Sequence, residues 1–117
     1  MNRKEKNERK MIIGQYIDLG KGHYTDDEVD RLYDAVKNRE VYDGKTINHP
    51  PRTSTQWYSG GKYERTEWET ETFCSDDTGI RIEKKYESRD DDGERHSGRT
   101  VKKQPRDILS FLYRMKK

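Results

Sequence analysis

The chain has 117 residues, of which 41% are charged and 27% hydrophobic, and its net charge of +2 is a near-cancellation of 25 basic and 23 acidic side chains. A chain of this length is expected to form one domain, residues 1–117, with room for one small core. Its single cysteine, Cys74, excludes an intrachain disulfide framework and is typical of the reducing cytosol. No apolar run is long enough for a secretory signal or a membrane-spanning helix, so we expect a soluble cytoplasmic protein.

The charge is unevenly distributed along the chain. Residues 2–10 carry five basic and two acidic side chains, and residues 64–94 carry five basic and twelve acidic ones. Residues 99–117 carry seven basic side chains and one acidic one. Basic ends around an acidic middle favour charge-guided docking on a partner over the coating of a polyanion.

A first helix is expected over residues 2–19, where apolar residues recur at helical spacing after a charged start. The recurring apolar residues are Met11, Ile12, Tyr16 and Leu19. Residues 1–10 are expected to fray because they are almost entirely polar. Gly20-Lys21-Gly22 is expected to end the helix.

A second helix over residues 26–37 is indicated by its capping residues. Thr25 is suited to the N-cap and Glu28 to the reciprocal position of a capping box. One apolar stripe then follows at helical spacing, made by Val29, Leu32, Tyr33 and Val36.

The pattern breaks after this helix. Asp43-Gly44 and Pro50-Pro51 mark turns and extended backbone. We therefore expect residues 38–52 to form a long loop, which is unusual in a small domain and suited to mobility or to contact with a partner.

Four strands are expected after the loop, joined by turns as an antiparallel meander. They cover residues 53–59, 62–73, 80–88 and 94–102, which are rich in Thr, Tyr, Trp and Ile. The turn signals between them are Ser59 to Lys62, Ser75 to Gly79, and Asp90 to Gly93.

The turns predict which residues share a face of the sheet. A two-residue turn at Gly60-Gly61 places Thr55 opposite Thr66, and one at Asp92-Gly93 aligns the last two strands. One face then collects the apolar residues Trp57, Trp68, Ile80, Ile82, Tyr86 and Val101. This face is predicted to be dry and covered by helices.

The other face is predicted to be charged and open to solvent. Pairing of Glu71 with Arg81 would also bring Lys85 to Glu67 and Glu87 to Arg65, which are favourable cross-strand pairs. The charged residues of this face are Arg65, Glu67, Glu69, Glu71, Arg81, Glu83, Lys85 and Glu87.

A last helix closes the predicted fold. Pro105 is suited to the first helical turn after a cap at Gln104. Its apolar stripe consists of Ile108, Leu109, Phe111, Leu112 and Met115. The predicted fold is therefore α+β, a four-stranded antiparallel meander with one face covered by N-terminal and C-terminal helices.

No motif for metal binding or catalysis stands out. Cys74 and the histidines His23, His49 and His96 are scattered without the spacing of a metal site, so no metal is expected. Residues 90–94 are expected to form a hairpin turn, because they lack the alternating ligands and length of a calcium loop. Glutamates alternating on an open sheet lack the distinct, desolvated environments of acid–base catalysis, so no enzyme is expected.

Nucleic-acid binding is one of two functions that the sequence supports. Trp57, Tyr58 and Tyr63 lie near the first hairpin, where aromatic rings beside basic residues can stack on bases. The basic residues expected to contact the phosphates are Arg95, Arg99, Lys102, Lys103 and Arg106. The acidic strand residues Glu67, Glu69 and Glu71 argue against this function, because they would repel phosphate across an exposed sheet.

Docking on a protein is the other function, and the one that the sequence favours. An acidic strand surface suits the basic groove of a larger protein, where carboxylates take the place of phosphates. The residues expected to make that contact are Glu67, Glu69, Glu71, Asp76, Asp77, Tyr58 and Tyr63. A purely solubilising role explains the same carboxylates equally well.

In size, charge and lack of motifs the chain resembles accessory proteins of phages and mobile elements, including inhibitors of host nucleases and immunity systems. The resemblance implies a non-enzymatic anti-defence or host-takeover protein that modulates or inhibits a larger cytoplasmic protein or protein–nucleic-acid machine. No cofactor is expected. Self-association or a bound partner would add stability to so small a core.

Overall fold

The computed structural model describes residues 1–115. Its helices are α1 (Arg3–Ile13), α2 (Asp26–Lys37), α3 (Arg39–Tyr42) and α4 (Pro105–Met115). Its strands are β1 (Thr46–Asn48), β2 (Arg52–Tyr58), β3 (Gly61–Asp76), β4 (Gly79–Asp90) and β5 (Arg95–Lys102). The α+β class, the antiparallel sheet and the contact of the C-terminal helix with the sheet are confirmed.

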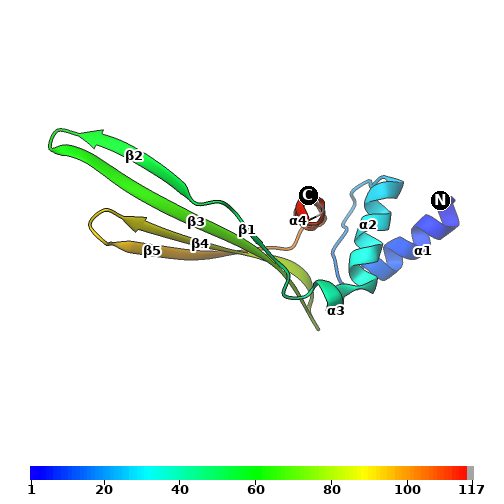
Figure 1. Ribbon diagram of the computed structural model, residues 1–117. Coiled ribbons are helices and arrows are strands. Elements are labelled where there is room, and N and C mark those ends of the chain that lie inside the picture. The colour runs from blue at the N-terminus through cyan, green and yellow to red at the C-terminus, as the bar shows by residue number, and fades with distance from the viewer. Residues whose placement is uncertain (116–117) are drawn as a thin grey trace.

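The molecule is elongated. The helices gather at one end, and the sheet extends away from them as an arm whose two hairpin tips separate (Figure 1). The described chain measures 66 × 26 × 25 Å and its radius of gyration is 18.7 Å. A compact domain of this length has a radius of gyration of about 13 Å. Much of the sheet therefore has no helix packed on either face.

The α2 helix begins as predicted. The Glu28 backbone N–H donates to Thr25 Oγ1 at 3.2 Å, and the Thr25 backbone N–H donates to Glu28 Oε1 at 2.8 Å. This reciprocal pair is a capping box, which satisfies two backbone donors that the helix itself leaves free.

Replacing Thr25 with alanine is expected to lower the free energy of unfolding by about 1 kcal/mol, because a donor at the start of α2 loses its acceptor. Urea denaturation followed by circular dichroism measures the change. Ser110→Ala, at an exposed position inside α4, is the control and is expected to change stability by less than about 0.5 kcal/mol. Equal losses in the two variants would contradict a capping role.

The α1 helix is shorter than predicted. It ends at Ile13 with Gly14 as its C-cap, and the next residues form turns in which the Tyr16 and Ile17 N–H groups donate to the Ile13 carbonyl. Ile13 and Ile17 are buried, whereas Met11 is 75% exposed. Of the apolar residues that the sequence indicated, Met11 and Ile12 are exposed, whereas Tyr16 and Leu19 are partly buried against the core.

The segment of residues 38–52, predicted to be a loop, contains α3 and β1. β1 pairs with the part of β3 nearest the helices, and β2 pairs with the rest of the same edge. Pro50 and Pro51 separate the two strands, because proline has no N–H to donate to a ladder. The sheet thus has five strands instead of four.

The predicted register between β3 and β4 is wrong. Phe73 lies opposite Ile82, and Trp68 lies opposite Glu87, so Trp68 and Ile82 are on opposite faces. The strands run to Asp76 and Gly79 and leave only a two-residue turn, and the observed pairing differs by three residues from the predicted one. An odd shift exchanges the faces of a strand. None of the predicted charge pairs (Glu71–Arg81, Glu67–Lys85, Arg65–Glu87) is in register.

Two smaller register differences occur at the other strand pairs. Thr66 lies opposite Thr53 instead of Thr55, a shift of two residues that keeps Trp57 and Trp68 on one face as predicted. Val101 lies opposite Glu83, one residue away from the predicted pairing, so it shares a face with Trp68 and not with Tyr86.

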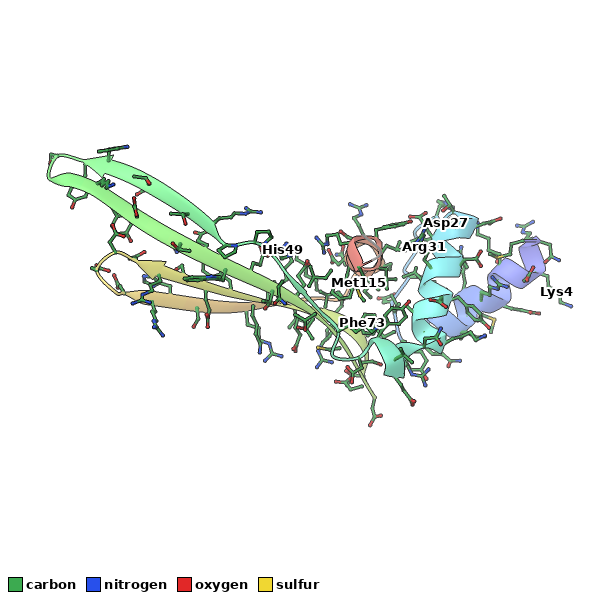
Figure 2. The ribbon with its side chains drawn as sticks, in the orientation of Figure 1. Lys4, Asp27, Arg31, His49, Phe73 and Met115 are labelled. Carbon is green, nitrogen blue, oxygen red and sulfur yellow. The ribbon has the colours of Figure 1, made fainter. Side chains whose placement is uncertain are left out.

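We call the face that carries Phe73, Ile80 and Ile82 the inner face, and the opposite one the outer face. The Phe73 ring packs against Phe111 of α4 and Tyr42 of α3, with centroid distances of 6.0 and 5.5 Å. Phe73 lies where the sheet meets the helices (Figure 2). The buried core is Ile13, Ile17, Val29, Leu32, Ala35, Val36, Phe73, Ile80, Ile82, Ile108, Leu109, Phe111 and Leu112. It is confined to the helical end of the sheet.

Candidate functional site

The outer face of the arm carries two pairs of like charges. Lys85 of β4 lies directly opposite Arg99 of β5, and Arg89 lies directly opposite Arg95. Like charges directly opposite each other on neighbouring strands are destabilising. The two pairs are four residues apart along each strand, which corresponds to about 13 Å.

Most of these cations have no counter-charge. Arg99 contacts Glu83. Lys85, Arg89 and Arg95 are exposed and make no ion pair or hydrogen bond with residues 1–115. We call Lys85, Arg89, Arg95 and Arg99 the basic pairs of the outer face. Within the described residues, no ion pair relieves the repulsion between Arg89 and Arg95.

Trp68 lies between the two basic pairs. Its cross-strand partner Glu87 occupies the position midway between Lys85 and Arg89 on β4. The indole is 38% exposed, and it lines an open depression of about 480 Å³ together with Glu87, Ser88, Arg89, Arg95, His96 and Ser97. The outer face thus presents an aromatic ring bracketed by positive charge.

A second tryptophan stands farther out on the same face. Trp57 of β2 is 78% exposed and lies opposite Lys62 of β3. Between the two indoles the outer face of β2 and β3 carries three threonines and one acidic residue, Glu64, whose Oε1 lies 3.5 Å from Lys62 Nζ. The threonines are Thr53, Thr55 and Thr66. An acidic loop, residues 91–94, bounds this surface at the tip of the β4–β5 hairpin.

The inner face of the distal arm holds a hydrogen-bond network, although Arg65 Nε and Asp90 Oδ1 lie buried without a hydrogen bond to any described residue. Arg65 Nη2 donates to Tyr86 Oη at 2.5 Å and to Ser88 Oγ at 3.0 Å. Tyr86 Oη in turn donates to Glu67 Oε1 at 3.3 Å. A hydrogen bond to Asp90 raises the pKa of Tyr63 to about 12. Unlike the outer face, this surface has its charges matched.

Glu71 is a buried carboxylate at the base of the arm. Its side chain is 2% exposed. Arg114 Nη2 of α4 donates to Oε1 at 2.7 Å, and His49 Nε2 lies 2.8 Å from Oε2. Lys84 Nζ lies 3.8 Å from Oε1. Glu71 therefore connects the sheet, the segment between β1 and β2, and the C-terminal helix.

The acidic residues predicted to dock on a partner do not form one open surface. Glu67, Glu69 and Glu71 share a face as predicted, but it is the inner face, and Glu71 is buried. Burial raises the pKa of the Glu69 carboxyl, but the hydrogen bond and charge of Lys84 outweigh this, so the pKa lies below its ordinary value.

The other members of that predicted set are dispersed. Asp76 and Asp77 lie at the β3–β4 turn, at the opposite end of the strands from exposed Tyr58 and half-buried Tyr63. Hydrogen bonds from Thr78 and Arg81 hold the pKa of Asp76 well below its usual range.

The predicted basic set is also divided. Arg95 and Arg99 lie on the outer face, whereas Lys102 lies opposite Ile82 and therefore on the inner face. Lys103 follows β5, and Arg106 lies in the first turn of α4. Lys85 and Arg89 were not predicted as part of this set, because they lie opposite Arg99 and Arg95 only in the observed β4–β5 register, which differs by one residue from the predicted one. Their alternation with Glu83 and Glu87 on β4 was the available signal.

Two further groups carry potential chemistry. Asp90, Glu94 and His96 bring one potential ligand atom each to within 4.8 Å of one another. Asp90 is buried and also faces Arg65, with Nε 3.9 Å from Oδ1, and residues 91–94 form a turn as predicted. Burial raises the pKa of the Cys74 thiol, which disfavours a nucleophilic role.

No protein-family model, curated protein or solved structure matches this chain. None of the helices within residues 1–115 has both the length and the apolar character needed to cross a bilayer. The functional proposal therefore rests on the geometry of the sheet.

Proposed function

We propose that the protein binds nucleic acid through the outer face of its sheet arm. The observation that carries this proposal is the two basic pairs of the outer face, Lys85 with Arg99 and Arg89 with Arg95. They are exposed on a surface that no helix within residues 1–115 covers. A phosphate group bound at each of these two pairs would relieve a repulsion that the chain does not fully relieve itself. Lysine and arginine side chains on one face are the usual electrostatic footprint of such binding.

Three glutamates of the acidic middle do not oppose this proposal. Glu67, Glu69 and Glu71 point to the inner face, away from the basic pairs. Their charges are matched by Arg65, Lys84 and Arg114. The repulsion of phosphate that the sequence suggested is therefore largely removed from the outer face.

The test is a salt-dependent binding titration. Fluorescence anisotropy of a labelled oligothymidylate and of a labelled duplex is measured against potassium chloride concentration. Wild-type protein is expected to bind at low salt with a steep negative slope of log affinity against log salt. The double variant Arg89→Gln/Arg95→Gln is expected to flatten that slope by roughly 1.4 on the single strand, at about 0.7 for each lost phosphate contact.

The control is Arg3→Gln/Lys4→Gln, which removes the same charge from α1 at the far end of the molecule (Figure 2). It is expected to leave the slope unchanged. The arm variant is expected to keep or gain stability, because it removes two like charges that face each other. The absence of nucleic-acid binding at low salt, or equal slopes for both double variants, would reject the proposal.

Docking on a larger protein is a second candidate function, supported by the tip of the β2–β3 hairpin. Trp57 and Tyr58 are 78% and 61% exposed and project from opposite faces. Exposed aromatic residues are frequent anchors of protein interfaces. Docking through this tip would be supported if the wild type captures a host protein and the variant Trp57→Ser/Tyr58→Ser does not. The variant Glu67→Lys is expected to leave that capture unchanged.

A further inference from the structure

We infer that the nucleic acid bound by the outer face is single-stranded, with a base stacked on Trp68. This inference rests on the proposed function and specifies its ligand. Trp68 is exposed and lies opposite Glu87, which is midway between Lys85 and Arg89 on the neighbouring strand. Each basic pair is two residues from that rung, which is about 7 Å along the strands.

This spacing favours a ligand that offers a base between two phosphates. An indole can stack only on a base whose faces are free, and such bases belong to single strands and loops. The positive charges on both sides of Trp68 would then contact phosphates before and after the stacked nucleotide. A duplex presents its phosphates but keeps its base faces covered.

The width of the sheet also disfavours a duplex. At the level of Thr66 the sheet has four strands side by side, with Thr53, Thr66, Arg89 and Arg95 in one row. Four strands span about 14 Å between their outer axes. The major groove of B-DNA is about 12 Å wide and admits a helix or a two-stranded ribbon. A sheet of this width is too wide to enter the major groove, and it offers a flat surface to a ligand instead.

Trp57 extends the platform outward. It lies opposite Lys62, six residues from Trp68 along β3, which corresponds to about 20 Å. The threonine side chains between the two indoles are short and do not obstruct the surface between them. The charge of Glu64 is paired with Lys62. Further nucleotides of the same strand would cross this region, so Trp57 is a second stacking position.

The experiment compares an oligothymidylate with its duplex for wild type, Trp68→Ala and Trp68→Phe, at one low salt concentration. The wild type is expected to bind the single strand more tightly than the duplex. Trp68→Ala is expected to weaken single-strand binding about tenfold, because it removes stacking and no phosphate contact. Trp68→Phe keeps an aromatic face and is expected to recover most of the affinity.

A spectroscopic readout supplements the affinities. In the Trp57→Phe protein Trp68 is the remaining tryptophan, and its fluorescence is expected to be quenched by the single strand and unaffected by the duplex. Two results would overturn the inference and leave nucleic-acid binding intact. One is tighter binding of the duplex than of the single strand. The other is an unchanged single-strand affinity for Trp68→Ala together with unchanged Trp68 fluorescence in the Trp57→Phe protein. Failure to bind either probe would reject the proposed function itself, and binding of polyglutamate in their place would identify an acidic protein as partner.

Discussion

Replacing Glu71 with alanine is expected to lower the free energy of unfolding by about 3 kcal/mol. Removing one member of a buried charge group leaves its partners uncompensated and typically costs about 3–5 kcal/mol. The lower end applies here because Arg114, His49 and Lys84 are partly exposed and can recover water. The loss is large relative to the ~5–15 kcal/mol of a typical domain.

The control for this variant is Glu69→Ala on the same strand face. Glu69 is partly exposed and pairs with Lys84 at 3.3 Å, so its removal is expected to cost less than about 1 kcal/mol. Urea denaturation at neutral pH measures both. Similar midpoints for the two variants would show that Glu71 does not hold the C-terminal helix and the His49 segment to the sheet.

Replacing Gly79 with alanine is expected to cost about 3 kcal/mol. Gly79 begins β4 with φ +127°, a conformation that is essentially restricted to glycine and costs other residues about 1–3 kcal/mol. A Cβ there would lie 2.5 Å from the Tyr16 carbonyl oxygen, and that oxygen accepts a hydrogen bond from the Ile80 N–H at 3.0 Å. The N-terminal segment would have to move away and lose this bond, which contributes about 1 kcal/mol.

Gly93→Ala is the matched control for this prediction. Gly93 also has a positive φ, +84°, but apart from Gly93 and its two chain neighbours no described residue has an atom within 4 Å of the point that a Cβ would occupy. Its replacement is expected to cost about 1–2 kcal/mol from backbone strain alone. Thermal and urea denaturation of the two variants separate strain from close approach, and equal losses would exclude a role for the Tyr16 contact.

Only part of the candidate site could be predicted from local sequence patterns. Arg95 and Arg99 were predicted to contact nucleic acid, and the structure places both on the outer face. Lys85 and Arg89 lie opposite them because of the β4–β5 register, and Trp68 shares their face because of the β3–β4 register. The observed pairing of Glu71 with Lys84 is three residues from the predicted pairing with Arg81, and the turn has two residues where the sequence indicated five. The turn signals between Ser75 and Gly79 do not distinguish the two lengths.

The sequence alone was sufficient to locate helices and hairpins whose ends are set by neighbouring residues. The capping box of Thr25 and Glu28 marks the start of α2, Pro105 marks the start of α4, and glycine-containing turns mark the hairpins. Which face of each strand is covered depends instead on contacts between distant segments. Side chains alternate along a strand, so one residue of slip exchanges the faces, and contacts such as Phe73 with Phe111 select among the slips. For this reason Glu71 is a buried anchor and Trp68 an exposed platform.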